Sequence, residues 1–381
     1  MKDSIDRICA AFAEQAVGAS CLVFKDGQEL YSGQFGFADR EAELPMRRDS
    51  IFRLFSLTKP VTATAAMILA ERRLLSPDDP VSRFFSEYAH MTRQDGDSVV
   101  PCTSELKISH LLTMTSGLPY PNNYDISVRR SAELFDRVIA GNNGGTPVTT
   151  AEFTRSAAEI PLSFEAGTRW DYGISADVLC GIIEKVADMP LGEFLRVNIF
   201  KPLGMDDTGF YVPADKLDRF TVLYKWSDSK LVRDEDCYLA LTDYKSPPSF
   251  ESGGAGLCST IVDYSRFVNM LCGGGEYGGV RILGREIVEN MTAPKLNAAQ
   301  NTMWDRLKGY NYGYLMRIMT EPEIAEVRTG AGEFGWDGWT GTYFNANLQN
   351  GIAVLFFTQI AGAGTTWQAT EISRIVYEHL T

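Results

Sequence analysis

Near the N-terminus the pattern of hydrophobic and polar positions changes from a helical period to a strand-like one. Over 5–17 apolar residues recur at every third or fourth position, which predicts a helix. The segments 19–25 and 28–36 are strand-like, and the turn pair Asp26-Gly27 between them is typical of a tight β-hairpin. The chain is therefore expected to begin with a helix followed by two antiparallel strands.

The C-terminal part of the chain carries the same kinds of element. A strand-like segment at 312–319 precedes a second hairpin, in which an Asn-Gly turn joins strands at 342–347 and 352–358. The tail over 366–380 has its apolar residues on one helical face. Both ends of the chain therefore supply strands to one antiparallel sheet, with terminal helices flanking it.

The middle of the chain, from about 56 to 300, is mostly helical in period and has few strand signals. We predict an α/β (α+β) fold in which the antiparallel sheet is accompanied by an all-helical domain. The sheet domain is discontinuous, with residues 1–55 and 300–381, and residues 56–299 form the mainly helical domain. The helical segments are 61–73, 108–114, 132–138, 151–158, 176–187, 191–199 and 260–271.

Composition and charge narrow the range of partners. The chain has 381 residues, with 36 Lys and Arg against 49 Asp and Glu, so its net charge is −13. A surface this negative repels phosphate backbones and anionic lipids. No segment approaches the run of about 18 apolar residues that spans a bilayer. We expect a small-molecule substrate and neither a nucleic-acid nor a membrane partner; the oligomeric state stays open.

Several familiar signals are absent. The seven cysteines form no C-x-x-C pair, and the polar N-terminus has no secretory signal, so we expect a cytoplasmic protein. There is no G-x-S-x-G elbow, H-E-x-x-H pair or Walker loop. A G-x-G-x-x-G match at 273–278 follows a helical segment instead of a strand. We therefore expect no metal and no cofactor.

With only three histidines, a serine nucleophile would need another base, and a buried lysine can serve. Three Ser-x-x-Lys pairs occur, beginning at Ser56, Ser104 and Ser227, and only the first lies between an apolar run and a strong helix. At that helix start Ser56 and Lys59 are neighbours on one face. The free N–H groups of the helix end would stabilise an anion formed beside the serine.

Two further elements fit an acyl-transfer site. Tyr172 opens a helix, from where its phenol can point into a cleft; beside a protonated lysine its pKa is expected to fall, which would suit a general base or acid. The segment 332–342 has four glycines and leads into a strand. Its edge could supply a backbone N–H to an oxyanion.

In order and context these motifs resemble the serine β-lactamase and penicillin-binding protein superfamily, in its class C branch, and most of all the family VIII carboxylesterases. The resemblance implies a β-lactamase/transpeptidase-like fold with the active site between the sheet and the helical domain. It also implies that Ser56 is the acylated nucleophile and that Lys59 and Tyr172 share general acid and base roles. The backbone N–H groups of Ser56 and Trp339 would form the oxyanion hole. The matching segments are Ile51–Ala70, Ile108–Leu118, Trp170–Gly181, Ile199–Thr208, Ser252–Phe267 and Phe334–Phe344.

Two departures from the family pattern bear on the substrate. Ile174 stands where lactamases and peptidases usually carry an Asn that binds a substrate amide. Trp336, Asp337 and Gly338 replace a Lys-Thr-Gly or His-Thr-Gly, so the cation that a substrate carboxylate needs is missing. Both changes favour neutral esters. An aromatic pocket for acyl chains or aryl alcohols is predicted from Tyr120, Tyr124, Trp170, Trp336 and Trp339.

The leading hypothesis is a carboxylesterase that cleaves neutral short-chain or aryl esters through a serine acyl-enzyme. A β-lactamase, a D-aminopeptidase or DD-peptidase, or an acyltransferase could use the same site. A non-catalytic ligand-binding relative is the alternative from another class. The natural substrate, and whether Lys59 or Tyr172 removes the serine proton, stay open at this point.

Overall fold

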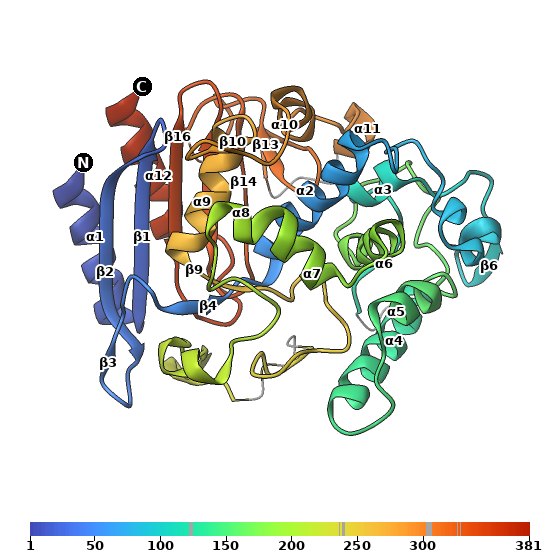
Figure 1. The fold of residues 1–381 in the computed structure, drawn as a ribbon, viewed down its shortest axis with the longest axis horizontal. Helices are drawn as coiled ribbons and strands as arrows, with labels where there is room; N and C mark the ends of the chain where they lie inside the picture. Colours follow the sequence, from blue (N-terminus) through green and yellow to red (C-terminus); the bar gives the residue numbers. More distant parts are fainter. Residues whose placement is uncertain (122–124, 236, 238–240, 302–306, 326, 328) are drawn as a thin grey trace.

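The computed structural model describes residues 1–381 except 122–124, 236, 238–240, 302–306, 326 and 328. The predicted sheet is confirmed: it has eight antiparallel strands in the order β12-β13-β14-β15-β16-β1-β2-β3 (Figure 1). Strands from the two ends of the chain meet where β1 pairs with β16. The strands are β1 (Gly18–Lys25), β2 (Gln28–Asp39), β3 (Leu44–Pro45), β12 (Tyr310–Tyr312), β13 (Arg317–Met319), β14 (Glu333–Asp337), β15 (Tyr343–Asn347) and β16 (Ile352–Phe357).

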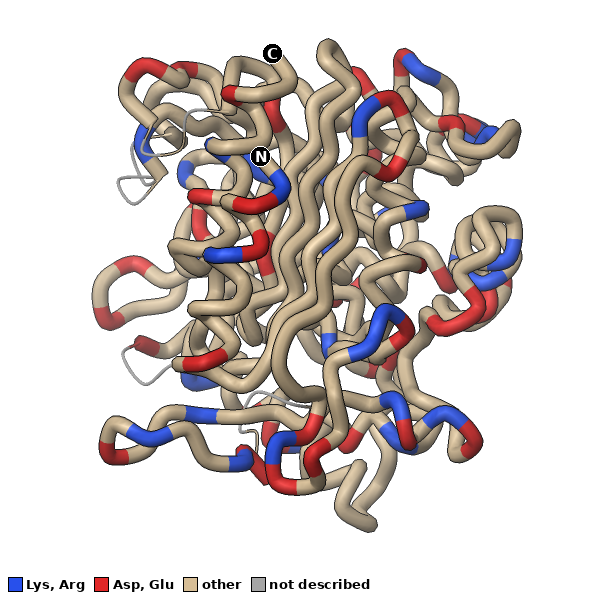
Figure 2. The backbone as a smooth tube through the Cα atoms, turned by 90° about the vertical axis from the view of Figure 1, so that its left-hand side faces the viewer, with Lys and Arg blue, Asp and Glu red and all other residues tan. Residues whose placement is uncertain are grey.

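Helices cover both faces of this sheet. The terminal helices α1 (Lys2–Gln15) and α12 (Trp367–Leu380) pack on one face, against side chains such as Cys21 and Val23. On the other face α9 (Ile261–Cys272) contacts β1, β15 and β16. Charged residues gather on the helices and loops around the sheet (Figure 2). Because both faces are covered, β1 is buried along nearly its whole length, which explains its continuous apolar sequence.

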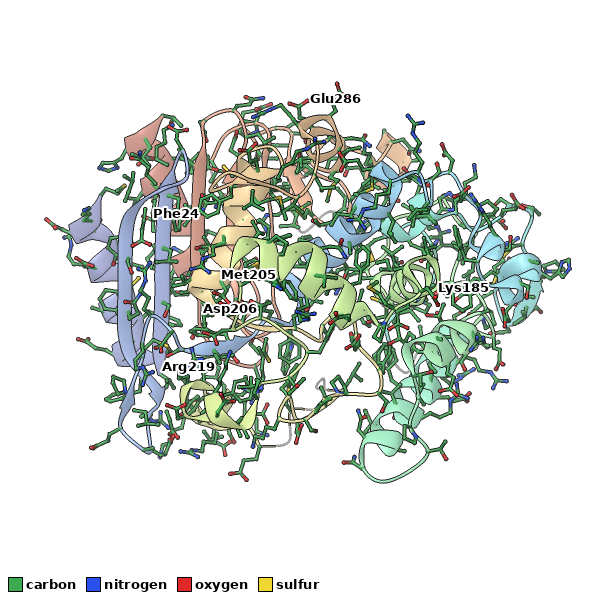
Figure 3. All side chains as sticks on the ribbon, in the orientation of Figure 1. Phe24, Lys185, Met205, Asp206, Arg219 and Glu286 are labelled. Carbon is green, nitrogen blue, oxygen red and sulfur yellow. The ribbon has the colours of Figure 1, made fainter. Side chains whose placement is uncertain are left out.

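The helical part lies beside the sheet, on the side away from α1 and α12 (Figure 1). Side chains fill the space between the sheet, which carries Phe24, and α6, which carries Lys185 (Figure 3). The predicted helices are present. Besides α9, they are α2 (Thr58–Glu71), α3 (Ile108–Leu112), α4 (Ile126–Asn142), α5 (Thr150–Ala157), α6 (Ser175–Ala187) and α7 (Leu191–Leu195). Further helices that the sequence analysis did not predict are α8 (Lys201–Leu203), α10 (Arg285–Met291) and α11 (Ala298–Asn301).

Short two-stranded ribbons connect these parts. One of them, β4 with β9, leads directly into the segment that carries Ser56. Across the described residues, no helix is both long enough and apolar enough to cross a lipid bilayer. The ribbons are β4 (Ile51–Arg53) with β9 (Cys258–Thr260), β5 (Thr92–Asp95) with β6 (Ser98–Pro101), β7 (Tyr224–Ser227) with β8 (Lys230–Arg233), and β10 (Glu276–Tyr277) with β11 (Val280–Arg281).

Two details differ from the sequence-based expectation. The single strand expected at 312–319 is two strands, β12 and β13, because the chain reverses between Gly313 and Met316 with Leu315 at φ 56°. Helix α9 falls within 56–299, the range assigned to the helical domain, yet it packs on the sheet. Hydrophobic period predicts that a segment is helical but does not say which layer it covers. The division into two domains stays a prediction.

A buried ion pair joins the neighbouring strands β13 and β14. The Arg317 guanidinium is 3.3 Å from the Glu333 carboxylate, and both side chains are almost fully buried. Tyr310 and Thr329 donate hydrogen bonds to the same carboxylate. Burial raises the pKa of Glu333, and the positive charge of Arg317 acts in the opposite direction. The buried charge of Glu333 is therefore stabilised only while Arg317 is present beside it.

We expect Arg317→Met to lower the free energy of unfolding by about 3–5 kcal/mol, because it leaves the Glu333 carboxylate buried without its cation. The matched control is Arg130→Met, which breaks an exposed pair with Glu133. That change should cost no more than about 1 kcal/mol. Urea unfolding of the two variants beside the wild type measures both values. Equal losses would contradict a special cost for the buried pair.

Candidate active site

Ser56 lies in a tight turn between β4 and α2. The turn is a single 3₁₀ segment, Phe55–Leu57, and Phe55 holds a left-handed backbone with φ 46°. Such a conformation costs a non-glycine residue about 1–2 kcal/mol, so the surrounding contacts must maintain it. Tyr264 donates a 2.7 Å hydrogen bond to the Leu57 carbonyl, and the Phe55 ring packs on Trp339 with centroids 5.3 Å apart. The turn presents Ser56 at the N-terminal end of α2.

Lys59 lies one turn after Ser56 and is completely buried. Its Nζ donates to Ser56 Oγ at 3.1 Å, to Tyr120 Oη at 2.9 Å and to the Gly254 carbonyl at 2.7 Å. Burial lowers the pKa of Lys59 to about 7, although the negative charges of Asp177 and Asp337 act to raise it. An amine with this pKa is partly neutral near pH 7 and can accept a proton from Ser56.

Tyr172 approaches the same point, but it does not open a helix as expected: α6 begins at Ser175, and Tyr172 lies in the loop before it. Its hydroxyl accepts a 3.2 Å hydrogen bond from Trp336 Nε1, and Lys59 Nζ lies 4.6 Å from the centre of its ring. The expected fall in the pKa of Tyr172 is wrong: burial raises this pKa, and the hydrogen bonds of Ser56 and Trp336 only partly oppose that effect. The desolvation of the phenolate outweighs the nearby amine. The Tyr172 phenol therefore keeps its proton in the resting site.

The glycine-rich segment forms β14 and the turn that follows it. Gly338 comes so close to the Ser56 turn that a Cβ atom there would meet the Leu54 carbonyl at 2.3 Å. Asp337 and Trp339 flank this close approach and line the cavity beside Ser56. Burial raises the pKa of Asp337, while the charge of Arg317 opposes this. The C-terminal end of β14 thus lies against the turn, as a second oxyanion donor from this segment requires.

The sequence analysis named Ser252–Phe267 as a segment that resembles the family, but it did not expect the start of this segment to contact Lys59. Ser252–Ala255 precedes β9, and its Gly254 carbonyl is one of the three partners of the Lys59 amine. Asp177, in the first turn of α6, accepts hydrogen bonds from Ser252 Oγ at 2.5 Å and from Gly254 N at 3.0 Å. Besides that resemblance, the Gly-Gly pair was an available signal, because a side chain at Gly254 would collide with Asp177 and with Tyr120.

A cavity of about 560 Å³ opens in front of Ser56. Among the described residues that line it, none is Lys or Arg, whereas three are Asp and six are aromatic. An apolar wall comes from α4 on the side away from the sheet. The lining residues are Phe55, Ser56, Tyr120, Pro121, Ala132, Phe135, Asp136, Ile139, Tyr172, Asp177, Leu241, Ser252, Ala255, Trp336, Asp337, Trp339, Gly362 and Gly364.

The structure brings together some of the predicted pocket residues and not others. Tyr120, Trp336 and Trp339 line the cavity, and Tyr120 also contacts the Lys59 amine. Trp170 does not line it and instead stacks on Tyr172 with centroids 6.2 Å apart. Ile174 is fully buried at the start of α6, among core residues. Tyr124 lies outside the described residues.

The histidines take no part in this arrangement. His110 accepts a hydrogen bond from the Lys107 backbone at the start of α3, and His379 lies in the last turn of α12, where it contacts the N-terminus. His90 ends a surface 3₁₀ segment. Within the described part of the chain, no three His, Cys, Asp or Glu side chains are grouped as metal ligands would be. The chemistry this arrangement supports is transfer of an acyl group to Ser56.

Known proteins resemble this chain over nearly its full length. A family model with the description Beta-lactamase matches residues 5–374. Esterase EstB of Burkholderia gladioli is 30% identical over 368 residues, or 93% of this chain and 88% of EstB. Acyltransferase calJ of Penicillium decumbens is 26% identical over 362 residues, or 89% and 82% of the two chains. The solved structure of EstCE1, a hydrolase with promiscuous acyltransferase activity, has a TM-score of 0.83 at 25% identity and matches 98% of each chain.

Proposed function

Because the chain belongs to the Beta-lactamase family, we propose that it is a serine carboxylesterase that cleaves small neutral esters through an acyl-enzyme on Ser56. The observation that carries this proposal is the 3.1 Å contact between Ser56 Oγ and the buried Lys59 amine, beside a cavity with aromatic walls. The similarity to an esterase and to a hydrolase supports the same activity.

In the proposed reaction the neutral Lys59 amine takes the Ser56 proton while the serine oxygen attacks the ester carbonyl carbon. The backbone N–H groups of Ser56 and Trp339 stabilise the negative charge on the carbonyl oxygen. The bond to the alcohol oxygen then breaks, and Tyr172 gives that oxygen a proton. A water molecule gives one proton to the Tyr172 phenolate as its oxygen attacks the acyl-enzyme. The bond to Ser56 then breaks, Lys59 returns its proton to the serine oxygen, and the carboxylic acid is released.

The charge of the cavity supports neutral substrates. A β-lactam or a peptide with a free C-terminus would bring a carboxylate close to Asp337 and Asp136. A carboxylate that enters a partly desolvated site loses hydration, and without a cationic partner no ion pair offsets that loss of free energy. Trp336 offers a flat apolar surface where related sites hold a cation.

Two p-nitrophenyl esters of nearly equal shape test this selectivity. The 4-methylpentanoate is neutral, and the hydrogen succinate carries a carboxylate in place of its terminal isopropyl group. We expect kcat/KM to be at least about 10-fold higher for the neutral ester, as one uncompensated charge costs about 1–3 kcal/mol. Nitrocefin, which also carries a carboxylate, should turn over slowly. Faster cleavage of the succinate or of nitrocefin would show that another group binds the carboxylate.

Acyl transfer is the second candidate function, because the similarity to calJ and EstCE1 extends over most of the chain. The acyl-enzyme is the same in both reactions, and only the nucleophile that attacks it differs. Addition of an alcohol to the ester assay separates them. A transferase forms the new ester in place of the free acid, whereas a hydrolase continues to release the acid.

We also propose that the protein resides in the cytoplasm. All seven cysteines are free, including the buried neighbours Cys9 and Cys21. Reduced cysteines are typical of a reducing compartment. Mass spectrometry after alkylation of freshly lysed cells would test the thiol state directly.

A further inference from the structure

Asp177 is connected to Lys59 by a continuous series of hydrogen bonds. Lys59 Nζ donates to the Gly254 carbonyl at 2.7 Å. The same peptide group donates its Ala255 N–H to Ser252 Oγ at 3.1 Å. Ser252 Oγ in turn donates to Asp177 Oδ1 at 2.5 Å. We call these three bonds the Asp177 series; they run from the first turn of α6, through the loop before β9, to the amine beside Ser56.

The direction of every bond in the Asp177 series is determined by its chemistry. A carboxylate and a peptide carbonyl only accept hydrogen bonds, and a peptide N–H only donates. Ser252 Oγ must therefore receive the Ala255 N–H and direct its own proton to Asp177. Hydrogen bonds aligned in this way polarise one another, so the negative charge of Asp177 makes the Gly254 carbonyl a stronger acceptor.

A strong acceptor at Gly254 determines how the Lys59 amine is oriented. Of its three partners, the Gly254 carbonyl cannot donate, so it always takes one N–H of Lys59. When the amine is neutral, its second N–H can go to Tyr120 Oη, which leaves the lone pair directed to Ser56 Oγ. That orientation is the one in which Lys59 can accept the serine proton.

We propose that Asp177 is a positioning residue, which acts through Ser252 and the peptide between Gly254 and Ala255 to orient the Lys59 amine toward Ser56. The inference rests on the proposed function of Ser56 and Lys59. It explains why the Asp177 carboxylate, which is only 1% exposed, and the Ser252 hydroxyl that donates a hydrogen bond to it lie in this buried position.

Two substitutions separate the charge of Asp177 from its connection to Lys59. Asp177→Asn keeps an oxygen that can accept from Ser252 but removes the negative charge. Ser252→Ala keeps the charge, together with the bond from Gly254 N to Asp177, but interrupts the Asp177 series. We expect each variant to lower kcat for a p-nitrophenyl ester about 10-fold while KM changes less than about 2-fold, since both side chains border the cavity but are almost completely buried.

The pH profile distinguishes positioning from a purely structural role. The groups facing Lys59 are Ser56, the phenols of Tyr120 and Tyr172, and the carboxylates of Asp177 and Asp337. The two carboxylates raise the pKa of Lys59. Asp177→Asn should therefore move the midpoint of the Lys59-dependent limb of kcat/KM to lower pH. Ser252→Ala keeps the charge and should move that midpoint less.

A double variant tests whether Asp177 acts through Ser252. Once Ser252→Ala has interrupted the series, adding Asp177→Asn should lower kcat less than about 3-fold further, because coupled residues are not additive. The matched control is Asp263→Asn, which removes another buried carboxylate, on α9, outside the cavity. It should leave kcat and the pH midpoint unchanged. Circular dichroism of each variant verifies that it is folded.

The proposal is overturned if folded Asp177→Asn and Ser252→Ala keep wild-type kcat and pH midpoint, or if their effects multiply fully in the double variant. Failure of the proposed function gives a different result. In that case Ser56→Ala would retain turnover of the same ester, whatever happens in the Asp177 and Ser252 variants.

Discussion

Replacement of Ser56 by alanine is expected to abolish turnover of p-nitrophenyl esters, with kcat/KM lower by at least about 10⁴-fold. The loss is large because no acyl-enzyme can form without the serine oxygen. The neighbouring groups remain in place: Lys59 keeps its bonds to Tyr120 and Gly254, so the cavity should stay intact. Initial-rate assays at several substrate concentrations measure the change, and intact-mass spectrometry detects the acyl-enzyme in the wild type alone.

The chain offers matched controls for this substitution. Ser104 and Ser227 also begin Ser-x-x-Lys segments, but Ser104 Oγ donates to Glu165 and Ser227 is exposed at a hairpin. Ser104→Ala and Ser227→Ala should keep wild-type kcat/KM within about 2-fold. If one of them lost activity while Ser56→Ala kept it, the assignment of the nucleophile would be wrong.

Removal of either proton-transfer group should cost at least about 10²-fold in kcat, the usual scale for lost acid–base catalysis. In Lys59→Ala no buried amine remains to accept the Ser56 proton. In Tyr172→Phe the leaving alcohol loses its proton donor, and Trp336 Nε1 loses the hydroxyl to which it donates. Folded variants with near-wild-type turnover would contradict the mechanism, and thermal melts establish that they are folded.

The pH dependence identifies which group is the base. Because burial lowers the pKa of Lys59 to about 7, its amine is charged below that pH and cannot accept a proton. Burial raises the pKa of Tyr172, so its phenol keeps its proton throughout this range. We therefore expect kcat/KM to rise with pH, with a midpoint near pH 7. A limb that falls near pH 7 would mean that charged Lys59 is required and that Tyr172 is the base.

Local sequence patterns predicted the antiparallel sheet, the helices and the contact between Ser56 and Lys59. Alternating residues, with Asp-Gly and Asn-Gly turns, predicted both hairpins of the sheet, and helical periodicity predicted the helices. The contact between Ser56 and Lys59 follows from their spacing of three at a helix start. These features depend on residues close in sequence, where backbone geometry leaves few alternatives.

Other features of the site depend on how distant segments pack. Tyr120 was expected only as a pocket ring, yet its hydroxyl contacts Lys59, which precedes it by 61 residues. Trp170 was expected in the same pocket but packs behind Tyr172. The number of residues that separate Tyr120 and Trp170 from Ser56 does not say which way their side chains point. That orientation depends on how the distant segments pack together.

The sequence by itself thus determined the antiparallel sheet, its flanking helices and the pairing of Ser56 with Lys59. Only the tertiary structure decided that Lys59 is fully buried, and that Asp177 and Ser252 reach it through one peptide group. The physical reason is the range of the interactions. Hydrophobic periodicity and i, i+3 spacing describe residues that are close in sequence. Burial, and the hydrogen bonds between α2, α6 and the loop before β9, exist only after those segments have packed together.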